Sequence, residues 1–208
     1  MVNIFEIQNS TKGKICLYAN GYGKLSWQFI PVLNPVAPNQ IQKGMKVYNY
    51  DNSYFFATDL YEATVIAYTL EKYLQTREFP QFEENHIKCD GKQLSIVHFP
   101  EGKMSALTFF IHSNHIYLGY SLFANKQKLF SLNLALSYFK VHTLVRILNQ
   151  APTLTMVSEV FKRQKSQSNS NGKASRNNNN VNRASNTAPF TPNKTVAADD
   201  IQQVFESL

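Results

Sequence analysis

Short segments rich in β-branched and aromatic residues fill the first part of the chain, and Gly, Pro and Asn separate them. This pattern predicts strands joined by turns. The predicted strands span residues 3–8, 14–20, 24–33, 45–50 and 53–57. Apolar residues then recur at helical spacing from about residue 59 to 76. Asp59 with Glu62 three residues later is typical of a capping box, although Thr58 could also be the cap.

The second part of the chain repeats this plan. Strand-like segments occur at residues 86–89, 93–99, 104–112 and 115–124, and a second helix is predicted from about 131 to 149. The predicted fold class is therefore α+β, with two repeats of about four antiparallel strands followed by a helix. Strands and helices do not alternate, which argues against a Rossmann or barrel enzyme.

The second predicted helix carries two apolar stripes, whereas a surface helix needs only one. One stripe consists of Leu134, Tyr138, Val141, Val145 and Leu148, and the other of Leu132, Leu136, Phe139 and Ile147. Either this helix is buried deeply within a single domain, or one stripe packs on the sheet and the other on a second subunit. The pattern alone favours neither alternative.

The composition changes near residue 161. From Lys162 to Ala198 the chain has seven basic residues and no acidic one, among many Asn, Ser and Gln. Such a segment cannot bury a core, which predicts a disordered basic linker over residues 161–198 after a domain of residues 1–160. The chain carries a net charge of +7, and residues 162–208 account for +4 (seven basic, three acidic), which leaves +3 for residues 1–161.

Lysines and aromatic residues interleave with glycines between residues 12 and 31. Lysines attract phosphates, and aromatic faces stack on unpaired bases at about 1–3 kcal/mol per base. We predict phosphate contacts from Lys12, Lys14, Lys24 and Lys46, and stacking by Tyr18, Tyr22 and Trp27. An ordinary hairpin with core aromatics and solvated lysines would show the same pattern.

Three segments resemble motifs of the Whirly proteins, which are plant single-stranded-DNA binders. They are Lys12-Gly13-Lys14 with its apolar strand, the run Leu25-Ser26-Trp27-Gln28-Phe29-Ile30-Pro31-Val32, and the strand-to-helix step at residues 54–62. The likeness covers roughly residues 10–150. The doubled order of strands and helix is also shared with kinetoplastid guide-RNA-binding proteins and the transcriptional positive-coactivator fold. Ile15-Cys16-Leu17-Tyr18 departs from the plant pattern, which has a smaller, alanine-rich strand.

This resemblance implies two sheets that cross at a steep angle, with helices packed between subunits. It also implies a ring-like tetramer that binds single strands along sheet edges between protomers.

The last ten residues, 199–208, combine acidic and large apolar side chains. Asp199, Asp200, Ile201 and Phe205 resemble the acidic tips of bacterial and phage single-strand-binding proteins, although Glu206-Ser207-Leu208 follows the aromatic residue here. This resemblance implies binding to replication or recombination proteins. The tip could equally form a short amphipathic helix that docks in a partner groove.

Other chemistry is weakly indicated. His112 and His115, or His86 and Cys89, offer too few ligands for a metal site, and we predict neither a metal, another cofactor nor an enzyme. The chain has two cysteines and no recognisable secretory leader, which predicts buried free thiols in a reducing compartment. It also has no apolar run of 18 residues, and we expect a cytoplasmic protein of a bacterial or phage-infected cell.

The sequence therefore predicts a sequence-tolerant single-stranded-DNA-binding protein of replication, recombination or repair. The alternatives are an RNA-binding or annealing protein on the same fold, and a protein-binding adaptor.

Overall fold

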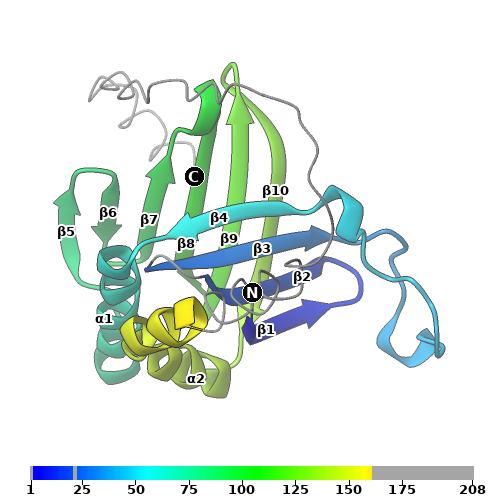
Figure 1. The fold of residues 1–208 in the computed structure, drawn as a ribbon, viewed down its shortest axis with the longest axis horizontal. Coiled ribbons are helices and arrows are strands. Elements are labelled where there is room, and N and C mark those ends of the chain that lie inside the picture. The colour runs from blue at the N-terminus through cyan, green and yellow to red at the C-terminus, as the bar shows by residue number, and fades with distance from the viewer. Residues whose placement is uncertain (1, 21–22, 161–208) are drawn as a thin grey trace, which may run out of the picture. The chain divides into compact units, whose positions relative to one another are not determined.

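The computed structural model describes residues 2–20 and 23–160, which form two antiparallel sheets and several helices (Figure 1). This confirms the predicted α+β class. The first sheet has the order β1-β2-β3-β4, and the second has the order β10-β9-β8-β7-β6-β5. The strands of the first sheet are β1 (Val2–Asn9), β2 (Gly13–Asn20), β3 (Lys24–Pro31) and β4 (Tyr54–Thr58). Those of the second are β5 (Gln81–Glu84), β6 (Ile87–Asp90), β7 (Gln93–His98), β8 (Met104–His112), β9 (His115–Ala124) and β10 (Gln127–Leu136).

The chain divides into one compact unit, Met1–Glu159, and a second unit, Val160–Leu208. The predicted linker over residues 161–198 and the tip over 199–208 lie outside the described residues, as does Tyr22. Among the helices of the described residues, none is long and apolar enough to cross a membrane.

Helix α1 (Leu60–Thr76) follows the first sheet, and α2 (Tyr138–Asn149) follows the second. The predicted capping box is confirmed, because the Asp59 side chain accepts a hydrogen bond from the Glu62 N–H and the Glu62 side chain accepts one from the Asp59 N–H, both at 2.8 Å. The two helices pack against each other. Residues 151–159 are also helical.

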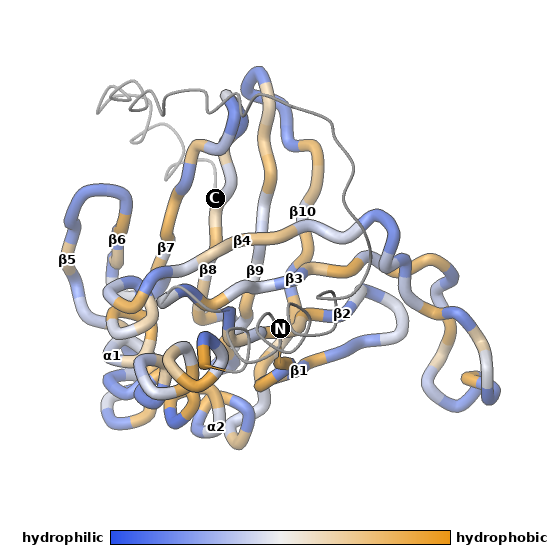
Figure 2. Tube along the Cα trace, viewed as in Figure 1, coloured by the Kyte–Doolittle hydropathy of each residue, from blue (hydrophilic) through white to orange (hydrophobic). Residues whose placement is uncertain are grey.

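The two sheets pack face to face through aromatic side chains. Phe29 stacks on Tyr120 with ring centroids 4.5 Å apart, and Trp27 meets Phe109 edge-on at 6.0 Å. The strands of one sheet run across those of the other, as the resemblance implied (Figure 1). Apolar positions follow the strands, whereas the β5–β6 turn and other hairpin ends are polar (Figure 2). One core therefore lies between the sheets and under α1 and α2.

The second predicted helix begins seven residues later than expected, at Tyr138 instead of 131. The residues before it form β10, whose burial alternates: Leu132, Leu134 and Leu136 face the core, and Ser131, Asn133 and Ala135 are exposed. Alternation with a period of two is typical of a strand. The two apolar stripes predicted for one helix therefore combined residues of β10 with residues of α2. Within α2 itself, Val141, Leu144, Val145 and Leu148 are buried, and Phe139 is 80% exposed.

Two further predictions about strands are corrected. Residues 45–50 do not form a strand, because only Val32 and Tyr48 form a ladder bridge there. Pro31 and Pro35 lack the N–H groups that would extend this pairing. The second sheet has six strands instead of four, because β5 and β10 were not predicted.

Candidate nucleic-acid interface

Alternation along the first sheet separates a core-facing set of side chains from an outer set. On β2, Ile15, Leu17 and Ala19 are buried in the core, so Lys14, Cys16 and Tyr18 point to the opposite side. Strand register then places Gln28 of β3 beside Cys16, and Phe55 of β4 beside Gln28. We call Lys14, Cys16, Tyr18, Gln28 and Phe55 the outer face. Within it Cys16 is covered, Lys14, Tyr18 and Gln28 are partly buried, and Phe55 is exposed.

Hydrogen bonds fix the polar side chains at the centre of the outer face. The Tyr18 hydroxyl donates to Gln28 Oε1 at 3.0 Å, and Gln28 Nε2 donates to Ser53 Oγ at 2.9 Å. Burial raises the pKa of Tyr18 to about 12, so its hydroxyl keeps its proton at neutral pH. Phe55 lies next to this chain of hydrogen bonds and is 54% exposed. The face therefore presents an open aromatic ring beside an immobilised amide.

Lys14 lies at one end of the outer face, where Glu6 partly neutralises it. Its Nζ is 2.8 Å from Glu6 Oε2 and 6.0 Å from the ring centroid of Tyr50. Partial burial opposes protonation of Lys14, but the hydrogen bond to Glu6 outweighs it and raises the pKa of Lys14. The same bond lowers the pKa of Glu6. Lys14 is therefore held as a cation beside Tyr50, although Glu6 weakens it as a phosphate contact.

The other predicted lysines are exposed, but they do not form one cluster. Lys12 lies in the β1–β2 turn, and Lys24 begins β3 at the far end of the β2–β3 ladder. A strand of this length separates them by about 25 Å. Lys46 lies in the β3–β4 connection, where it lines a hollow of about 620 Å³ together with Tyr50. The lysines thus stand at both ends of the outer face.

Trp27 does not belong to this surface, and its predicted stacking role is wrong. The indole is fully buried between the sheets, and its Nε1–H donates to the Thr58 hydroxyl at 3.1 Å. It lies on the core side of β3, because its register partner Phe56 is also in the core. A ring without exposed surface cannot stack on a base.

Two exposed aromatic residues of the candidate interface were missed. Phe55 is flanked by Tyr54 and by the buried Phe56, so alternation about Phe56 could have placed Phe55 on the outer side. Tyr50, which is 52% exposed, gave no such signal, because it lies in a short 3₁₀ helix, Tyr50–Asn52, and reaches Lys14 only through the fold.

The cysteines are free and buried, as predicted. Cys89 belongs to the core, so it does not join His86 as a ligand. His112 and His115 face each other as partners in the β8–β9 ladder. Within residues 2–20 and 23–160, one group brings three possible metal ligands together, and it contains neither of these histidines.

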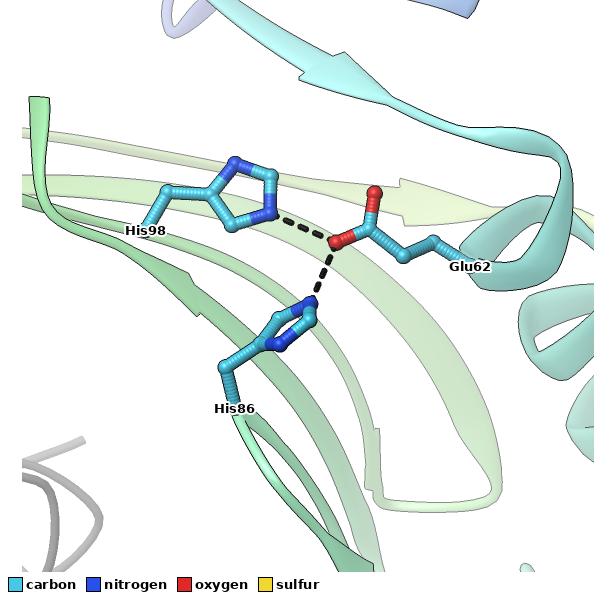
Figure 3. Close-up of side chains that lie close together, drawn as sticks. All are labelled: Glu62, His86 and His98. Atoms are coloured by element: carbon cyan, nitrogen blue, oxygen red, sulfur yellow. Dashed lines mark hydrogen bonds and ion pairs between the residues drawn. The ribbon is translucent and has the colours of Figure 1, made fainter. Parts of the chain in front are cut away.

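That group consists of Glu62, His86 and His98 (Figure 3). The Nε2–H groups of His86 and His98 both donate to Glu62 Oε1, at 2.7 and 2.5 Å. Burial opposes ionisation of Glu62, but these hydrogen bonds outweigh it and lower its pKa to about 2. The bond to Glu62 in turn raises the pKa of His86. No local sequence pattern indicated this group, because His86 and His98 lie 24 and 36 residues after Glu62.

Comparisons with known proteins give matches among solved structures. No protein-family model and no curated protein matches the chain. The crystal structure of WHY1 from Arabidopsis thaliana is similar, with a TM-score of 0.46 and 12% sequence identity over 86% of this chain and 97% of that one.

Proposed function

We propose that this protein binds single-stranded DNA on the outer face of its first sheet, with little dependence on sequence. The observation that carries the proposal is the pair of half-exposed rings, Phe55 and Tyr50, beside the fixed side chains of Gln28 and Lys14. Every base has a π-face, so such rings accept any unpaired base. In a duplex the base faces are already stacked on one another and are not open to these rings.

Electrostatics supports the same surface. Lys12 and Lys24 lie at opposite ends of the β2–β3 ladder. A single strand of DNA that follows this ladder would therefore contact exposed cations at both ends. Lys46 adds a third exposed cation close to Tyr50. Phosphate contacts of this kind release counterions, and binding must therefore weaken as salt rises.

Within this proposal the protein acts in replication, recombination or repair in the cytoplasm of a bacterial or phage-infected cell, and it binds without catalysing a reaction. Residues 161–198 act as a tether, and Asp199, Asp200, Ile201 and Phe205 recruit replication or recombination proteins. The protein assembles into a homo-oligomer, for which we favour a tetramer.

Fluorescence anisotropy with the full-length protein tests the proposal. Labelled single-stranded DNA, duplex DNA and single-stranded RNA of equal length are titrated at several salt concentrations. We expect the tightest binding to single-stranded DNA and a linear fall of log affinity with log salt. Tighter binding to RNA would show that the outer face binds RNA in preference to DNA. Absence of binding to all three ligands would refute the proposal and favour a protein-binding adaptor.

A further inference from the structure

We propose that Glu62, His86 and His98 form a binding site for a divalent transition-metal ion, with Zn²⁺ as the best match to the donor set. The three possible ligand atoms all lie within 4.8 Å of one another. Two imidazoles and one carboxylate are ligands that zinc accepts, and sites with three protein ligands leave a fourth position for water. The site does not depend on the nucleic-acid function proposed above.

Three separate elements bring the ligands to one point. Glu62 lies in the first turn of α1, His86 in the β5–β6 turn, and His98 at the end of β7. The Val97 N–H donates to the His86 carbonyl at 2.9 Å, which ties the β5–β6 turn to the end of β7. Both imidazole rings direct Nε2 toward the same carboxylate oxygen (Figure 3).

The ligands are already oriented by their other contacts. Glu62 Oε2 accepts the hydrogen bond of the capping box from the Asp59 N–H, which leaves Oε1 directed at the histidines. The His98 ring stacks on Phe56 with centroids 4.3 Å apart and an interplanar angle of 13°. Contacts beyond the ligands that fix ring and carboxylate orientation are a normal requirement of metal sites.

The geometry needs only a small adjustment to accept the ion. Bonds of about 2.1 Å in a tetrahedron place ligand atoms about 3.4 Å apart. The two contacts to Oε1 must therefore lengthen by about 0.8 Å, and the two histidine nitrogens, which lie within 4.8 Å of each other, must approach by no more than about 1.4 Å. The side chains of His86 and His98 are 37% and 32% exposed, so both rings border solvent, which can supply a water ligand. Glu62 is buried and stays fixed by its cap.

The bound ion would join the two halves of the fold. Glu62 lies in the first turn of the helix that directly follows β4 of the first sheet, whereas His86 and His98 lie in a turn and a strand of the second sheet. A ligand that binds only the folded chain stabilises it in proportion to the logarithm of its concentration. Zinc is therefore expected to raise the melting temperature, and this rise should continue as zinc is increased above its dissociation constant.

Zinc titration of the untagged, full-length, chelator-treated protein tests this site. A chromophoric zinc indicator measures affinity and stoichiometry, and Co²⁺ supplies a visible absorption spectrum that reports coordination. The variants His86→Gln and His98→Gln remove one ligand each, and circular dichroism verifies that each remains folded. His112→Gln with His115→Gln is the matched control, because it removes the other neighbouring histidine pair.

We expect one zinc ion per chain, at least tenfold weaker binding in each of the two ligand variants, and unchanged binding in the control. The wild-type protein should show Co²⁺ absorption bands that the ligand variants lack. Absence of zinc binding by the wild-type protein would overturn the proposal and leave the group as a carboxylate satisfied by two histidine donors. Loss of binding in the control alone would also overturn it.

Discussion

Replacing Trp27 with Phe should destabilise the fold and leave nucleic-acid binding intact. The substitution removes the Nε1–H that donates to the Thr58 hydroxyl, and both residues are fully buried. An unpaired buried hydroxyl costs about 1–3 kcal/mol. The smaller ring also forfeits apolar burial against Phe109, which adds about 1 kcal/mol. We therefore expect the free energy of unfolding to fall by about 2–4 kcal/mol.

Guanidinium titration followed by far-ultraviolet circular dichroism measures this loss, because the variant has no tryptophan left to report unfolding. A second variant separates the two contributions. Thr58→Val in the Trp27→Phe background removes the orphaned hydroxyl, so it should recover part of the lost stability.

Binding to single-stranded DNA is measured on the same variant at a temperature where it is folded. We expect the wild-type affinity, since the indole lies on the core side of the sheet. An unchanged stability, or a folded variant with much weaker DNA binding, would refute the assignment of Trp27 to the core.

Three further predictions concern other parts of the chain. In chelator, the free energy of unfolding should be greatest between about pH 4.5 and 6.5, as urea titrations would show. The lowered pKa of Glu62 gives stability that is lost as pH falls from 4.5 toward 2, and the raised pKa of His86 gives stability that is lost as pH rises above 6.5. Gly13→Ala should cost about 1–3 kcal/mol by urea titration, because the new Cβ would lie 2.7 Å from the Ile30 carbonyl oxygen at a φ of +153°. Deleting residues 199–208 should leave the affinity for naked single-stranded DNA unchanged or slightly higher by anisotropy, and a large loss would show that the tip itself binds DNA.

Local sequence signals predicted much of the fold. The capping box was predictable because Asp59 and Glu62 are only three residues apart. The first three strands were predictable because turn-forming residues separate them. The error at β10 has a physical cause. Leu132, Leu134 and Leu136 are spaced for a strand, but they run into the apolar positions of α2, so the joined segment also satisfied a helical period.

The candidate interface was harder to predict, because burial decides which aromatic ring is available. Trp27 and Phe55 both occupy strands of the first sheet, yet one is fully buried and the other is half-exposed. The two faces of the first sheet differ only because the second sheet covers one of them. The pairing of Lys14 with Glu6 depends on the register of the β1–β2 hairpin. The meeting of Glu62 with two histidines depends on contacts of α1 with segments that are distant in sequence.

The most direct test of the proposed interface compares three alanine substitutions for their effect on single-stranded-DNA affinity. Phe55→Ala and Tyr50→Ala remove the two rings, and Tyr68→Ala is a close control. Tyr68 is 48% exposed with a lysine Nζ 6.0 Å from its ring centroid, which nearly matches Tyr50. Each interface variant should bind about 5- to 150-fold more weakly by anisotropy, with Tyr68→Ala unchanged. Wild-type affinity in both interface variants, with the protein folded, would contradict the proposal that the outer face binds DNA.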